Sequence, residues 1–195
     1  MTAGDLKALT LTTLRQPDVA ARQLMAMSLG RDVLWIALFL AVILSTAMMT
    51  FQNLIYPPHP STPAVFTETW MYLGVVGIGE LLFIYGIYLA GGWMKGHGSL
   101  NDIMVVLVWW QLLQVGIQIV LVFLVMVAPP LASLASLAAM AYGVYVLLHF
   151  ISQAHQLNSL GRAAGVLVVA LFAIAFALSL LIALVGGSVV GLTNV

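Results

Sequence analysis

Five long apolar runs dominate the pattern of hydrophobic and polar positions along the chain. Each run reaches the roughly 20 residues that a helix needs to cross the hydrocarbon core, and none shows the strict alternation of a membrane β-strand. The pattern therefore predicts an all-α polytopic membrane protein, a bundle of five transmembrane helices. The predicted spans cover residues 33–51, 70–92, 103–128, 131–151 and 163–185.

The composition supports this class. Hydrophobic residues make up 63% of the chain and charged residues 6%, and the mean hydropathy is +1.13, whereas soluble domains carry about 25% charged residues. The formal net charge of zero offers no basic patch for nucleic acid. Because the chain has no cysteine, disulfides, thiolate metal sites and a cysteine nucleophile are excluded.

The first 31 residues are predicted to form a cytoplasmic leader ahead of a membrane domain at 32–195. Pro17 suits the first turn of a helix, and Ala20, Leu24 and Met27 then fall on one side of it. This spacing predicts a short amphipathic helix lying on the cytoplasmic face of the bilayer. The alternative is a partly ordered leader that only orients the first span.

The basic residues all fall on one side of the five-span topology. The positive-inside rule then places the N-terminus in the cytoplasm and the 186–195 tail outside. The basic residues are Lys7, Arg15, Arg22, Arg31, Lys95 and Arg162.

Glu80 is the most informative polar position, because it falls near the middle of the second predicted span. A carboxylate at that depth costs several kcal/mol unless it is protonated, paired or hydrated. Since no lysine or arginine lies within a span, we expect a neutral Glu80 that is hydrogen-bonded or faces a water-filled cavity.

Two polar stripes, each on one helical face by its spacing of three and four, could supply its partners. We expect both stripes to leave the lipid, face the bundle interior and meet each other. The functional interpretation is a proton- or ion-linked site or a head-group pocket, and the alternative is an interhelical hydrogen-bond network that fixes packing. The stripes are Gln111, Gln114 and Gln118 on the third span and Tyr142, Tyr145, His149 and Gln153 on the fourth.

Other motifs offer little for catalysis. His59, His97 and His155 fall in loops without a second ligand at metal spacing, so we expect no metal site and no cofactor. The nucleophile elbow and the phosphate-binding glycine loop are both missing from the sequence. The glycine run at 91–98 lies between two spans, which predicts a tight cytoplasmic turn rather than a nucleotide site.

That turn carries a family resemblance. Together with the Leu14-Arg15-Gln16-Pro17 stretch, it resembles the Yip family of five-span proteins, and most closely the short bacterial members. The residues of the family-like loop are Gly91, Gly92, Gly96, Gly98 and Asp102. Eukaryotic members bind Ypt/Rab GTPases. For this chain the resemblance implies a helical bundle in a bacterial inner membrane, with a role in membrane organisation or recruitment rather than a defined reaction.

Two functions remain open from the sequence. The first is a non-enzymatic membrane protein that binds lipids, other integral membrane proteins or further copies of itself. The second is a small transporter or channel whose proton- or ion-linked path surrounds Glu80. An intramembrane enzyme acting on lipid, with Glu80 or His149 as general base, is the weakest hypothesis because neither a nucleophile nor a metal set accompanies these residues.

Overall fold

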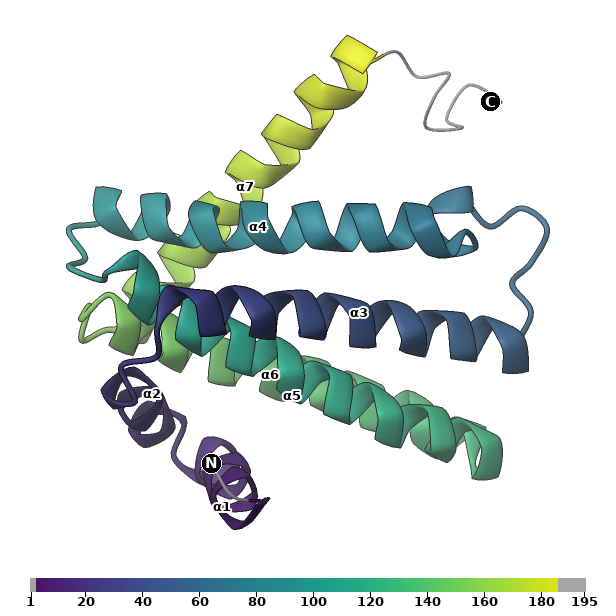
Figure 1. The fold of residues 1–195 in the computed structure, drawn as a ribbon, viewed down its shortest axis with the longest axis horizontal. Coiled ribbons are helices and arrows are strands. Elements are labelled where there is room, and N and C mark those ends of the chain that lie inside the picture. Colours follow the sequence, from purple (N-terminus) through teal and green to yellow (C-terminus); the bar gives the residue numbers. More distant parts are fainter. Residues whose placement is uncertain (1–2, 186–195) are drawn as a thin grey trace.

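The computed structural model describes residues 3–185, and within this range the chain forms seven α-helices and one short 3-10 helix, η1 (Figure 1). The all-α class predicted from the sequence is confirmed. The elements are α1 (Ala3–Arg15), α2 (Pro17–Ala26), α3 (Arg31–Ile55), η1 (Ala64–Phe66), α4 (Thr69–Trp93), α5 (Leu100–Val127), α6 (Pro129–Ala154) and α7 (Leu160–Val185).

Helices α3 to α7 are the five candidate membrane spans. Each has 25 to 28 residues. At 1.5 Å per residue that is about 38–42 Å, enough to cross a hydrocarbon core of about 30 Å. Their bounds differ from the predicted spans by no more than four residues at either end. The protein is therefore an integral membrane protein, although the predicted position of the 186–195 tail lies outside the described residues.

Local sequence explains where several helices begin. At the start of α5, the Ser99 hydroxyl accepts from the Asp102 amide at 3.1 Å, and the Asp102 carboxylate accepts from the Ser99 amide at 3.3 Å. This reciprocal pair is a capping box, which satisfies two otherwise unpaired amides. Pro17 opens α2, and Pro129 opens α6 after Ala128, which caps both α5 and α6.

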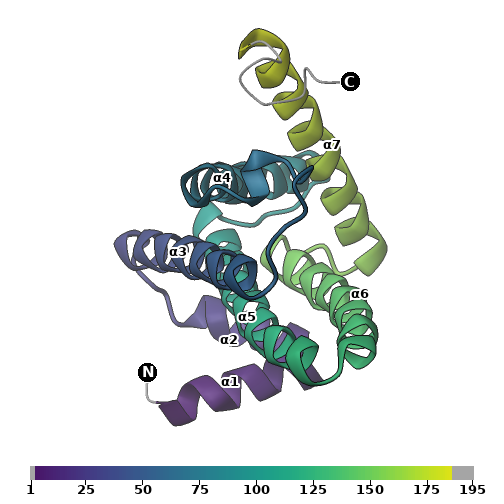
Figure 2. The same cartoon turned by 90° about the vertical axis from the view of Figure 1, so that its right-hand side faces the viewer.

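The leader contains two helices where one was predicted. The helix beginning at Pro17 is present as α2, but α1 precedes it, and the pair lies across the side of α5 and α6 (Figures 1 and 2). The sequence signal for α1 was weak because threonines interrupt its apolar positions at Thr10, Thr12 and Thr13. In the structure each of these hydroxyls donates to the carbonyl four residues earlier.

The bundle is packed more tightly at one end than at the other. We call the tighter end the basic end, because Arg22, Lys95 and Arg162 lie there, and we call the opposite end, with the 56–68 loop and Pro129, the proline end. Every residue from 103 to 109 of α5 is buried. On α7, by contrast, none of the described side chains from 171 to 180 is buried. The helices accordingly diverge toward the proline end, most visibly α7 (Figure 2).

Candidate functional site

A buried histidine joins the two turns at the basic end. His155 caps α6, is 1% exposed, and lies against three glycines of the 91–98 turn. A Cβ on Gly91 would lie 2.1 Å from the His155 ring, one on Gly96 would lie 2.8 Å from the His155 Cβ, and one on Gly98 would lie 2.4 Å from the Ala154 carbonyl oxygen. We call Gly91, Gly96, Gly98 and His155 the glycine–histidine joint, because no larger residue fits its three glycine positions without displacing a neighbour.

Hydrogen bonds fix the orientation of this histidine. Its Nε2 lies 3.0 Å from the Ile87 carbonyl oxygen of α4, and because a carbonyl only accepts, Nε2 carries the proton. The His97 amide donates to the His155 carbonyl at 3.0 Å. Burial lowers the pKa of His155 and outweighs the bond to Ile87, which acts in the opposite direction. The ring is therefore held neutral within the joint.

Arg162 adds a second connection between the same turns. Its guanidinium donates to the carbonyls of Met94, in the α4–α5 turn, and of Leu157, in the α6–α7 turn. The Met94 side chain packs in turn against Gly165 on α7, where a Cβ would lie 2.9 Å from the methionine Cε. The basic end is thus bound together through both side chains and backbone.

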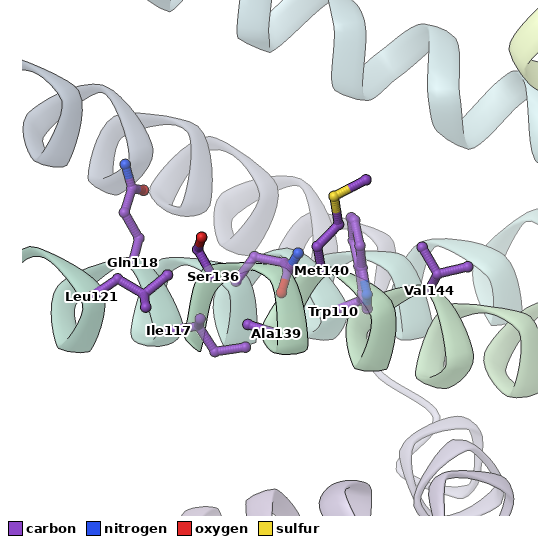
Figure 3. Close-up of a pocket in the computed structure, with 9 residues that line it drawn as sticks. Trp110, Ile117, Gln118, Leu121, Ser136, Ala139, Met140 and Val144 are labelled. Carbon is purple, nitrogen blue, oxygen red and sulfur yellow. The ribbon is translucent and has the colours of Figure 1, made fainter. Parts of the chain in front are cut away.

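The glutamine stripe of α5 faces α3 and a cleft between α5 and α6. Gln111 donates to the Ser45 hydroxyl of α3 at 3.2 Å. Gln114 and Gln118 line a cleft of about 340 Å³ together with Ser136 and Met140 of α6. Figure 3 shows Gln118, Ser136 and Met140 projecting to the same side of the helix pair. A smaller cleft of about 260 Å³ continues from Gln118 toward the proline end.

The stripe on α6 meets the leader instead. The Tyr142 hydroxyl donates to the Leu14 carbonyl of α1, and eleven residues further along α6 the Gln153 side chain accepts from Arg22 of α2 at 3.4 Å. Between them Tyr145 and His149 make an edge-on ring contact, with centroids 4.6 Å apart. The hydrogen bonds of the α6 stripe thus go to the leader and that of Gln111 goes to α3, while Gln114 lies beside Gly143 of α6 and lines the same cavity as Tyr142.

Glu80 lies near the middle of α4. It is half-buried on the face of α4 that carries Ile84 and Ile87, about 20 Å from the basic end of that helix. Gln114 lies about 21 Å along α5 from the same end. Within residues 3–185, however, the Glu80 side chain makes no hydrogen bond. A polar site around Glu80 stays a prediction.

Comparison with known proteins identifies the family. The family model for the Yip1 domain matches residues 11–182. The chain belongs to the Yip1 domain family. Members of this family are generally non-enzymatic membrane trafficking proteins. No curated protein and no solved structure matches the chain.

The matched range of this Yip1-domain chain includes the joint, both stripes and most of the leader. Of the family-like loop residues, Gly91, Gly96 and Gly98 pack on His155, Asp102 caps α5, and a Cβ on Gly92 would contact nothing within 4 Å. Sequence reasoning missed the role of His155, which it placed in a loop. The glycines signalled a close approach, but nothing in the sequence indicated that its partner lay some 60 positions away.

Proposed function

We propose that this Yip1-domain chain is a non-enzymatic membrane protein that organises or recruits other membrane proteins or lipids. The observation that carries the proposal is the large apolar surface that α6 and α7 leave uncovered within the described chain. Leu134 and Leu137 on α6 are 66% and 65% exposed, and Phe172 and Phe176 on α7 are 73% and 67% exposed. A partner in the membrane can pack against these side chains directly.

The surface outside the membrane favours the same role. The turns at 94–99 and 155–159 and the single residue between α5 and α6 are short, so apart from the leader and the 56–68 loop the chain offers little area for a soluble partner. Ala173 and Ala177 lie exposed one turn apart on α7, which allows the close backbone approach typical of helix pairs in membranes. Recruitment is therefore expected to act sideways, within the bilayer.

Site-specific photo-crosslinking in the native membrane tests this role. A photoreactive residue at Phe176 should give a protein adduct of discrete mass, while the same residue at Ile84, which is 1% exposed, should give none. An adduct of twice the chain mass would identify self-association, which is one form of recruitment. Adducts with lipid alone at several α6 and α7 positions would contradict recruitment of proteins.

A second function, transport coupled to Glu80, is supported by a separate observation. Glu80 shares the inward face of α4 with Ile84 and Ile87 and has no side-chain hydrogen-bond partner in the described part of the chain. Its depth along α4 is close to that of Gln114, which lines the α5–α6 cleft. A carboxyl group at that depth is typical of proton and ion paths in membrane proteins.

Flux measurements in liposomes distinguish the two functions. If the chain transports protons or ions, Glu80→Gln should abolish a flux that Glu68→Gln, in the exposed loop before α4, leaves unchanged. If wild-type protein conducts nothing above empty liposomes, the transport function is excluded and the recruiting role stands alone.

We also propose that the basic end faces the cytoplasm of a bacterial cell and the proline end faces outward, as the distribution of basic residues suggests. Because the chain has no native cysteine, single cysteines report orientation without background. A membrane-impermeant thiol reagent should label His59→Cys in intact cells and label His97→Cys only after the membrane is opened. The reverse result would invert the topology.

A further inference from the structure

A long groove runs along the outer side of α5 and α6 beneath the leader. Its volume is about 650 Å³, larger than either of the two clefts described above. Helix α1 forms its wall near the basic end. Apolar side chains supply most of the lining, including Leu6, Trp109, Ile117, Val120, Leu121 and Val146.

The leader is held in place at this wall by polar contacts. The Trp109 indole donates to the Thr13 hydroxyl at 3.0 Å, and Thr13 is fully buried. The Tyr142 hydroxyl donates to the Leu14 carbonyl on the neighbouring residue of α1. The four residues all line the groove, so the hydrogen bonds that dock α1 also shape the groove wall.

The groove is elongated along both helices. Its lining on α5 runs from Trp109 to Leu121, which is about 18 Å along the helix, and its lining on α6 runs from Ala135 to Val146, about 16 Å.

The surroundings of the groove favour a hydrocarbon chain over water. It lies against the central part of α5, away from both helix ends, where the bilayer supplies acyl chains rather than water. An empty groove of this size would lose dispersion contacts along its whole lining. Its long axis follows α5 and α6, which is also the direction that acyl chains take in a bilayer.

We propose that this groove binds one acyl chain of a membrane phospholipid and that α1, docked through Trp109 and Tyr142, retains it. The proposal rests on the recruiting function above, for which it names a lipid site. Its failure would leave recruitment through the α6 and α7 faces untouched, because Phe176 and Leu134 lie outside the groove lining.

A substitution that fills the groove gives the decisive variant. Gly116 lines the groove, and a Cβ there would contact nothing within 4 Å, so Gly116→Phe should place its ring in the space without a backbone clash. Gly74→Phe is the matched control, because Gly74 is also an exposed helical glycine with free space but lies on α4. Ala139→Leu, from the opposite wall, provides a second filling variant if Gly116→Phe unfolds.

Native mass spectrometry measures how many phospholipid molecules the full chain retains. The chain is released from nanodiscs of defined phosphatidylcholine and phosphatidylglycerol composition. Wild type and Gly74→Phe should each retain one phospholipid, and both filling variants should lose it by a factor of about ten or more, because the added side chain occupies the space that the acyl chain needs. Equal retention by filled and unfilled grooves, or no retained lipid in wild type, would overturn the proposal. A retained second copy of the chain in place of lipid would overturn it as well.

Tryptophan quenching locates the bound chain. In a variant with Trp35, Trp70 and Trp93 replaced by phenylalanine, the remaining tryptophans are Trp109 and Trp110, which both line the groove. A phospholipid brominated on one acyl chain should quench them, and Gly116→Phe should relieve the quenching while Gly74→Phe does not. Quenching that is identical in the two variants would place the lipid elsewhere and refute the groove assignment.

Discussion

Substitution of Gly91 by alanine tests the glycine–histidine joint most directly. In an ordinary helix interior this change stabilises by about 1 kcal/mol. At Gly91, however, the added carbon would lie 2.1 Å from the His155 ring, where unstrained carbon contacts need about 3.5–4.0 Å. The ring must therefore shift by more than 1 Å, and its 3.0 Å hydrogen bond to the Ile87 carbonyl cannot survive such a shift.

The size of the effect follows from two losses. Overpacking in a dense interior costs about 1–3 kcal/mol, and leaving a buried hydrogen-bonding group unpaired costs about 1–3 kcal/mol. After the propensity gain of about 1 kcal/mol is subtracted, we expect Gly91→Ala to lower the free energy of unfolding by about 1–5 kcal/mol. For a chain of this size that corresponds to a decrease in Tm of roughly 2–20 °C.

Thermal unfolding in nanodiscs measures this shift, with Gly92→Ala as the control. Gly92 lies on the same helix, and a Cβ added there would meet nothing within 4 Å, so its substitution should leave Tm unchanged or slightly raised. Removal of the ring by His155→Ala should abolish the extra cost of Gly91→Ala, which a double-mutant cycle reports as a coupling of about 2 kcal/mol or more. Equal Tm values for Gly91→Ala and Gly92→Ala, or an unchanged cost without His155, would refute the reasoning.

Three further predictions concern the basic end and the leader. Because burial lowers the pKa of His155, protonation favours the unfolded chain, and Tm should fall as the pH drops below about 6.5. In thermal scans at different pH values, His155→Gln should remove this part of the pH dependence. Ser99→Ala removes the α5 capping box and should cost about 1 kcal/mol, visible as faster amide exchange over the first turn of α5, and unchanged exchange would contradict it. Thr13→Val leaves the Trp109 indole without its hydrogen-bond acceptor and should make α1 more sensitive to limited proteolysis, while α2 stays protected. Equal cleavage of wild type and variant would argue against docking of α1 through this hydrogen bond.

Much of the fold could be predicted from the sequence because the membrane restricts the options. An apolar run the length of α7, for instance, has to be a helix, since only helices and closed barrels satisfy their backbone groups in lipid. The start of α2 at Pro17 was likewise predictable, because proline at the first helical position loses no hydrogen bond.

The arrangement of polar side chains was less accessible. Spacing shows that Tyr142 and Gln153 share a face of α6, but it does not indicate which neighbour covers that face. The neighbour is the leader. Helix α1 was not predicted, because the sequence does not show that its threonine hydroxyls form hydrogen bonds within the helix. The position of Glu80 near the middle of α4 follows from counting residues, while the neighbours of its side chain depend on how the helices pack.

The glycine–histidine joint also constrains the order in which the chain assembles during synthesis. His155 leaves the ribosome 64 residues after Gly91, a delay of about 3–13 s at 5–20 residues per second. During that interval the hollow formed by Gly91, Gly96 and Gly98 has no ring to fill it, so α4 and α5 enter the membrane with their shared turn still open. The turn closes only when α6 has been completed, and Arg162 then secures it as α7 begins. Completion of the fourth span is thus required before the turn between α4 and α5 can take its final packing.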